Sequence, residues 1–416
     1  MRSRVRVPGR TVAEGISRCR GAIRMFISFP SKKVGARTEG RPRLFQTALL
    51  TGLAVVLGAS GSAVALAKTS GVSKADLEHA AAQVAKYTKP PTFVSSGPKF
   101  DTKSLKGKVI YDIPVASDIP FNASIVAGEQ AAALKVGAKV VLWPNTGETS
   151  QWVTGMDTAI STHAGLIVLL GPNPAVLEPQ LAEAKAAGIP VIETHDLGAG
   201  ATLPTGIAGS VPAPFGIAGR LMADYAIHAT KGHVNAIIVV SKDATSTGFV
   251  DSGLLGEFKK YCGSACKLDV INVPIPNWAS SIPTEVESAL IKDTSANIVI
   301  PIYDGMVAST VTGIRGANAQ SRVKVVTFNG TPSVLSLIKT GGVAMDVGES
   351  TPWIGWSDMD LAFRILTQNK QVEEPAVWVR VWDKANVDGA GIPPAIGVGY
   401  GNAFVAGFEK EWKVTK

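Results

Sequence analysis

Short apolar runs alternate with amphipathic segments along the chain from Lys108 onwards. Such runs are typical of strands that are buried on both faces of a parallel sheet. They lie at 109–113, 139–143, 165–170, 190–194, 236–240, 268–273, 297–302 and 323–328, with a further candidate at 345–348. Segments of helical periodicity separate them, at about 122–135, 150–162, 175–187, 212–229, 247–261, 281–293, 306–317 and 332–340. Two sets of about four βα units, with a break near 196–212, predict an α/β fold of two doubly wound parallel-sheet lobes.

The two ends of the chain follow other patterns. Residues 72–87 predict one helix with Ser73 as its N-cap, and a Pro/Gly/Lys-rich connector follows up to 106. A Gly/Pro-rich tail leads to an amphipathic closing helix at 403–413, whose aromatic residues we expect to serve packing. The expected organisation is an export signal at 1–67, the N-terminal helix and connector at 68–106, lobe 1 at 107–211 plus 350–378, and lobe 2 with the C-terminal tail at 212–349 plus 379–416.

The charge distribution argues against a nucleic-acid partner. The formal net charge is +8, but residues 1–43 hold 12 Lys and Arg against 2 acids, and residues 44–67 hold no charge. The rest of the chain has 29 bases and 31 acids. The positive charge therefore belongs to the N-terminus and not to the globular part.

The N-terminus has the layout of a secretion signal. Arg41 and Arg43 precede an apolar run at 49–59, and Ala65-Leu-Ala67 fits an A-x-A cleavage site. Two alternatives stay open: the run is kept as a membrane anchor, or translation starts at Met25 and residues 1–24 are not made. Ser60 stands where a lipoprotein would have cysteine, so we expect no lipid anchor. The predicted location is the periplasm or the outer face of the cell envelope.

Two cysteines lie in the globular part. Cys262 and Cys266 are separated by Gly-Ser-Ala, and in an oxidising compartment such a pair predicts a disulfide. The closed loop is short, so its entropic stabilisation is expected to be modest. No further Cys or His lies nearby in sequence to complete a metal site, and catalytic redox pairs usually have two intervening residues.

Acids, amides and aromatic residues recur where the predicted strands end. In open parallel sheets ligands bind beyond the carboxyl ends of the strands, so these residues are the candidate ligand contacts. They are Asp118, Phe121, Asn122, His195, Asp196, Trp278, Asp304, Asn329, Glu349, Trp353 and Trp356. Carboxylates and amides suit hydroxyl groups, and aromatic faces pack on the C–H faces of sugars or on planar rings. Each alone also fits a turn, a cap or a core position.

Motifs for catalysis are missing from the sequence. It contains no G-x-x-x-x-G-K-[ST] phosphate loop, G-x-S-x-G elbow or H-E-x-x-H, and no dinucleotide fingerprint follows the first strand. We therefore predict a protein that is not an enzyme, with no catalytic residue, metal or cofactor. An α/β enzyme is the alternative, and it requires turnover of a substrate.

The chain resembles the type I periplasmic-binding-protein superfamily from about residue 105 to residue 385, in particular the ribose-binding-like branch that serves sugar ABC importers. Four segments carry the resemblance, in the order and spacing of that branch: Asp118-Ile-Pro-Phe-Asn122, Ala187-Gly-Ile-Pro-Val-Ile192, Ile302-Tyr-Asp-Gly-Met-Val307 and Val326-Thr-Phe-Asn-Gly-Thr-Pro332. The resemblance implies a small ligand, by default a sugar, held in a cleft that closes about a three-segment hinge near 209–215, 348–353 and 375–380. It also implies a monomer that delivers the ligand to an ABC permease with a separate ATPase.

The resemblance implies roles for single residues. Asp118, Phe121 and Asn122 are expected to contact ligand from the first lobe, and Asp304 matches the hydroxyl-binding acid. His195-Asp196 stands where the family commonly has an aspartate–arginine pair, and a second arginine expected near 251–252 is missing. An aromatic-rich, arginine-poor site leads to the hypothesis of a less polar or cationic ligand.

Two other functions are compatible with this fold. A ligand sensor that presents its bound state to a membrane receptor has the same sequence features as an importer component. A transcriptional regulator with this core needs a helix-turn-helix at its N-terminus, where this chain has the export signal.

Overall fold

A computed structural model describes residues 71–95, 97–369 and 379–414. The predicted export signal lies outside these residues. Among the helices that the structure describes, none has the length and apolar character needed to cross a membrane.

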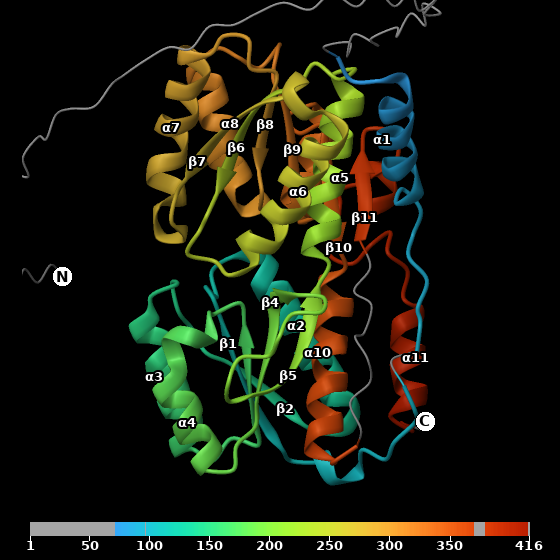
Figure 1. Cartoon of the computed structure of the whole chain (residues 1–416). Helices are drawn as coiled ribbons and strands as arrows, with labels where there is room; N and C mark the ends of the chain where they lie inside the picture. Colours follow the sequence, from blue (N-terminus) through green and yellow to red (C-terminus); the bar gives the residue numbers. More distant parts are fainter. Residues whose placement is uncertain (1–70, 96, 370–378, 415–416) are drawn as a thin grey trace, which may run out of the picture. The chain divides into compact units, whose positions relative to one another are not determined.

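The first lobe is built on a five-stranded parallel sheet in the order β2-β1-β3-β4-β5 (Figure 1). Its strands are β1 (Val109–Pro114), β2 (Lys139–Leu142), β3 (Leu166–Leu170), β4 (Val191–Gly198) and β5 (Ile207–Ala213). The central strand β3 is wholly apolar and buried because both faces of the sheet are covered. Its alternate residues therefore enter two separate cores: Leu166 and Val168 lie in one, Ile167 and Leu169 in the other.

Helices cover both faces of this sheet. On one face lie α2 (Pro120–Val136) and α10 (Thr351–Leu366), and on the other lie α3 (Thr149–Ser161) and α4 (Glu178–Ala186). The helix α10 comes from a distant part of the sequence, so the chain must return to the first lobe after most of the second lobe is built.

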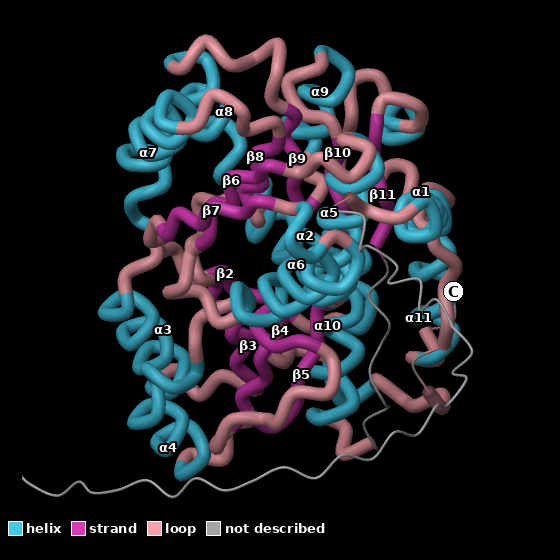
Figure 2. The backbone as a smooth tube through the Cα atoms, turned by 45° about the horizontal axis from the view of Figure 1, so that its top comes forward, coloured by secondary structure: helices cyan, strands magenta, loops and turns pink. Residues whose placement is uncertain are grey.

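The second lobe has a six-stranded sheet in the order β11-β10-β9-β8-β6-β7, flanked by helices (Figure 2). Its strands are β6 (Asn235–Val240), β7 (Lys267–Asn272), β8 (Ile298–Pro301), β9 (Lys324–Asn329), β10 (Met345–Glu349) and β11 (Val379–Asp383). Its helices are α1 (Lys74–Lys86), α5 (Phe215–Ala229), α6 (Ser246–Tyr261), α7 (Trp278–Lys292), α8 (Val307–Gly316) and α9 (Pro332–Thr340).

The predicted α/β fold of two parallel-sheet lobes is confirmed, with three local differences. The edge strand β5 was predicted as irregular, because Gly209 and Pro212 interrupt its apolar pattern; an edge position tolerates both. The run at 268–273 was predicted as a buried strand, but β7 is an exposed edge strand in which Val270 is 45% exposed.

The third difference is β11, which runs antiparallel to β10. The chain leaves the second sheet at the carboxyl end of β10 to form α10 in the first lobe. When the chain returns, it re-enters the sheet at that same carboxyl end, so β11 must run in the opposite direction to β10.

The terminal segments join the lobes in a way that the sequence did not predict. The helix α1 packs on the second lobe, where Ala80 and Val84 are part of its core. The connector then runs past α11 (Ala403–Glu411) into the first lobe, and the backbone N–H of Phe100 donates to the carbonyl of Glu411 at 2.8 Å (Figure 1).

The tail at 379–416 was expected to belong to the second lobe. Its first part does: β11 and then Val387, Ala390 and Tyr400 lie in the core of that lobe. The helix α11 lies in the core of the first lobe, because Phe404, Phe408 and Trp412 pack against the aromatic face of α10. Of the three crossovers expected, β5 to α5 and β10 to α10 connect the lobes where predicted. The segment 370–378, before β11, lies outside the described residues.

The contact between α5 and α6 is a close backbone contact in the second lobe that substitutions can test. These helices meet backbone to backbone: a Cβ atom on Gly253 would lie 2.2 Å from the carbonyl oxygen of Gly216. Gly256, one turn further along α6, is exposed and has open space around it.

We predict that Gly253→Ala lowers the free energy of unfolding by about 1–3 kcal/mol, because the added methyl group overpacks the contact between the helices. Gly256→Ala, on the same helix, is expected to raise it by up to about 1 kcal/mol, because alanine is the better helix former. Urea denaturation of the two variants measures both effects. Equal effects of the two substitutions would contradict the close packing of α5 on α6.

Candidate functional site

A cavity lies where the carboxyl ends of the two sheets face each other. The first lobe lines it with Val115, Ile119, Phe121, Asn122, Leu170, Gly171 and His195. The second lobe lines it with Ala244, Ser246, Ile275, Trp278, Tyr303, Asp304, Gly305 and Asn329. Six of the predicted contact residues are among them: Phe121, Asn122, His195, Trp278, Asp304 and Asn329.

Phe121 and Asn122 enter the cavity from the start of α2. Pro120 occupies the first turn of this helix, a position that its fixed φ and missing N–H suit. The Asn122 amide donates to the carbonyl of Ala116 at 2.8 Å, which holds the β1–α2 loop and leaves the side-chain oxygen of Asn122 available to a ligand.

His195 connects the two lobes at the cavity. It lies in β4 with a φ of 56°, and its Nε2 is 2.8 Å from Oε2 of Glu349, at the end of β10. The ring lies among Phe121, Phe215 and Phe328, with centroid distances of 4.9, 5.0 and 6.5 Å. Glu349 is 2% exposed and does not line the cavity, so it acts on the site through His195.

Asp304 is the acid of the cavity wall. It is 3% exposed, and its Oδ2 accepts a 2.6 Å hydrogen bond from the backbone N–H of Thr331. Burial raises the pKa of Asp304 to about 7, partly offset by that hydrogen bond. A carboxyl group near its pKa at neutral pH can either accept from or donate to a ligand hydroxyl.

An aromatic wall, formed by Trp278 and Tyr303, also belongs to the second lobe. The rings of Trp278 and Tyr303 are stacked, with centroids 6.3 Å apart at 26°. The indole N–H donates to Ser241 Oγ at 2.6 Å, and the Tyr303 hydroxyl lies 2.8 Å from Ser246 Oγ. Tyr303 and Ser246 were not predicted as contacts. Tyr303 directly precedes Asp304, so the strand-end rule that selected Asp304 could have found it as well.

Besides Glu349, two more predicted acids lie outside the cavity lining. Asp118 is exposed on the loop before α2. Asp196 is 1% exposed, and its carboxyl group lies beside Thr245 of the second lobe. Burial and the nearby Glu193 raise the pKa of Asp196 to about 8.

Trp353 and Trp356 were predicted as ligand contacts, and the structure puts them in an aromatic core instead. Trp353 stacks on Phe404 at 5.3 Å and Trp356 stacks on Trp412 at 5.1 Å. The prediction took the segment after Glu349 as a strand-end loop, but a helix begins there at Thr351. Residues three apart then share one helical face, which is the face that α11 covers.

A group of buried acids in the first lobe was also not predicted. Asp112, Glu129 and Asp358 lie in β1, α2 and α10, and each is 0% exposed. Burial raises the pKa of all three, to about 7 for Asp112 and about 8 for Asp358. Asp112 and Asp358 both lie beside Glu129, and repulsion from their charges raises the pKa of Glu129 further, so the group favours a protonated state. Thr194 Oγ1 donates to Asp358 Oδ1 at 2.6 Å.

The cavity therefore combines an acid, two amides, one imidazole and an aromatic wall, and none of the described residues that line it is Lys or Arg. A two-lobed α/β protein with such a cavity between the ends of its sheets belongs to the class of bilobal ligand-binding proteins. The chain matches the periplasmic binding protein domain over residues 110–371, so it belongs to that family, and its fold is the type I fold of the family.

Solved structures agree on the fold. A 5-methylthioribose transporter solute-binding protein from Thermotoga lettingae, in complex with 5-methylthioribose, has 19% identity and a TM-score of 0.62, over 75% of this chain and 99% of that one. A solute-binding protein from Agrobacterium vitis with bound α-D-tagatopyranose has 20% identity and a TM-score of 0.61, over 67% and 96%. A carbohydrate transporter from Acidothermus cellulolyticus, with myo-inositol, has 20% identity and a TM-score of 0.59, over 68% and 96%. No curated protein sequence matches the chain.

The buried acids predict how stability depends on pH. Asp358 has a pKa of about 8 when folded, against an ordinary value of 3.8. Between pH 5 and 7 the folded chain thus holds a proton that the unfolded chain has lost, so the free energy of unfolding falls as pH rises, by about 1.4 kcal/mol per pH unit for each such group. We expect wild type to be less stable at pH 8 than at pH 5, and Asp358→Asn to have the shallower decline in urea denaturation.

The matched control is Asp157→Asn, which changes an exposed acid on α3. Its decline with pH should equal that of wild type. A wild-type protein that is more stable at pH 8, or an Asp358→Asn variant with an unchanged slope, would show that these acids are not held protonated.

Proposed function

We propose that this protein is the extracytoplasmic solute-binding component of an ABC importer. The observation that carries the proposal is the cavity that both lobes line with polar and aromatic side chains at the carboxyl ends of their sheets. Membership in the periplasmic binding protein family supports the proposal. So do solved structures of similar fold that are an ABC sugar transporter subunit and a transporter solute-binding protein. The partners are then a membrane permease and a separate ATPase, and the protein acts as a monomer.

The mechanism is closure of the two lobes on the ligand. Phe121, Asn122 and His195 belong to one lobe, and Trp278, Asp304 and Asn329 to the other. A ligand that touches both groups binds the closed form better than the open form, so it shifts the population towards closure. In this mechanism the ligand is bound, enclosed and released chemically unchanged.

We propose that the ligand is a small neutral or cationic molecule with several hydroxyl groups and one apolar face. Asp304, Asn122 and Asn329 suit hydroxyl groups, and the Trp278–Tyr303 wall suits the apolar face. The solved neighbours hold 5-methylthioribose, tagatose and myo-inositol, which are ligands of this kind. An anion is disfavoured, since the cavity has a carboxyl group and neither Lys nor Arg among its described lining residues.

A thermal-shift screen tests the function. We expect a polyol, sugar, nucleoside or amine to raise the melting temperature by mass action, and anionic sugars and aromatic acids to give no shift. Ligand recovered from the complex should be chemically unchanged. Tight binding of anionic solutes alone, or turnover of a bound one, would refute the proposal.

Asp304→Ala tests the site. We expect the ligand shift to disappear in this variant, with at least a tenfold weaker Kd by calorimetry, because a buried charge-assisted or neutral hydrogen bond to the ligand is lost. The control is Asp118→Ala, which removes an exposed acid on a neighbouring loop and should keep the ligand shift. An unchanged Kd in Asp304→Ala would mean that the ligand binds elsewhere.

Export adds a prediction about the cysteines. The structure joins Cys262 and Cys266 in a disulfide, with Cα atoms 5.5 Å apart at the end of α6. We propose that this bond forms in the cell envelope after the segment 1–67, which holds Cys19, is removed. Thiol titration of denatured protein collected from the envelope should then find no free thiol before reduction and two after it. Two free thiols before reduction would argue against both the disulfide and the oxidising location.

A further inference from the structure

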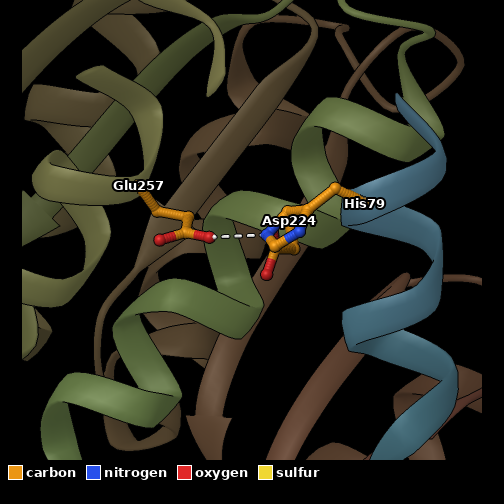
Figure 3. Close-up of side chains that lie close together, drawn as sticks. All are labelled: His79, Asp224 and Glu257. Carbon is orange, nitrogen blue, oxygen red and sulfur yellow. Dashed lines mark hydrogen bonds and ion pairs between the residues drawn. The ribbon is translucent and has the colours of Figure 1, made fainter. Parts of the chain in front are cut away.

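Three potential metal ligands meet outside the ligand cavity, where α1 packs on the second lobe. They are His79 from α1, Asp224 from α5 and Glu257 from α6, and Figure 3 shows their side chains converging from these three helices. One ligand atom from each lies within 4.8 Å of the others. His79 Nε2 and Glu257 Oε1 are 3.2 Å apart. The three residues are far apart in sequence, so only the fold brings them together.

Asp224 has a carboxyl oxygen for which the described residues supply no hydrogen-bond donor. It is 1% exposed, and its Oδ1 has no hydrogen-bond partner among the described residues. Burial and the neighbouring Glu257 raise the pKa of Asp224 to about 8. Burying a carboxyl group without a partner is costly, and a bound cation removes that cost.

The surroundings leave room for an ion and for water. His79, Asp224 and Glu257 line a cavity together with Gln83, Arg220 and Lys260. The His79 ring stacks on Tyr261 with centroids 3.9 Å apart at 17°, which fixes its orientation towards the acids. Arg220 and Lys260 are the competing cations. No hydrogen bond or ion pair joins Arg220 to Asp224 or Lys260 to Glu257 among the described residues, so their charges act only at a distance.

We propose that His79, Asp224 and Glu257 bind a divalent transition-metal ion of the zinc type. One imidazole nitrogen and two carboxylate oxygens form a donor set that Zn²⁺ accepts, with water in the remaining position. Two carboxylates balance the charge of the ion. The site is separate from the proposed solute function, and it uses α1, which lies before the matched family domain at 110–371. A bound ion fastens this N-terminal helix to α5 and α6.

The test uses the full chain, made without a histidine tag and freed of metal with EDTA. We expect calorimetry with ZnCl₂ to give one site per chain, and the melting temperature to rise with zinc concentration. MgCl₂ at the same concentrations should give no shift, because magnesium prefers oxygen ligands in octahedral geometry. His79→Ala and Asp224→Asn should each bind zinc at least tenfold more weakly.

Two further measurements separate metal binding from a folding defect. Asp224→Asn removes a buried acid of raised pKa, so its melting temperature without zinc should equal or exceed that of wild type. The control is His233→Ala, which removes an exposed histidine and should bind zinc as wild type does. No zinc binding by wild type, or equal binding by all variants, overturns the proposal and leaves the triad as an ion pair beside a protonated acid.

Discussion

The contact between His195 and Glu349 is the interaction around which the site is arranged. These residues lie at the carboxyl ends of β4 and β10, in different sheets, and Nε2 is 2.8 Å from Oε2. Glu349 is buried, and its other oxygen has no partner among the described residues. A carboxylate in that position needs the imidazole, so the two sheet ends are tied at the point where the chain crosses from β10 to α10. The same imidazole closes one side of the ligand cavity.

A second set of buried acids has no basic partner among the described residues and is stabilised in the interior by protonation instead. Thr194, next to His195, donates to Asp358, and Asp358 and Asp112 both lie beside Glu129. These groups run from the crossover into the interior of the first lobe. Burial favours their neutral forms, and a neutral carboxyl group can donate as well as accept. The hinge end of α10 is therefore held by the His195–Glu349 contact on one side and by protonated buried acids on the other.

The sequence predicted the fold and six of the residues that line the cavity, because both follow from one local pattern. A buried parallel strand ends in a polar residue, and parallel strands bring such ends to one edge. The errors arose where local pattern and tertiary context differ. Trp353 and Trp356 follow β10 directly, yet they belong to a helix, and no feature of the local sequence says that α11 will cover their face. The buried triad of acids, and the group formed by His79, Asp224 and Glu257, could not be predicted, since their members come from separate elements whose packing only the fold decides.

The terminal segments change what closure of this protein involves. The carbonyl of Tyr87 accepts from the backbone N–H of Val381 in the second lobe. Thirteen residues later, on the first lobe, the backbone N–H of Phe100 donates to the carbonyl of Glu411. The first-lobe end is anchored firmly: Arg364 is 1% exposed and bonds to Asp360, Glu411 and the carbonyl of Pro98. The connector is thus fixed at both ends while it spans the two lobes beside the crossovers. Within the connector, rotation of one lobe against the other must be absorbed between Thr88, whose carbonyl accepts from Arg380, and Phe93, which packs on Trp353 and Phe408. The chain forms neither helix nor strand there. The length and composition of this connector consequently set part of the free-energy difference between the open and closed forms.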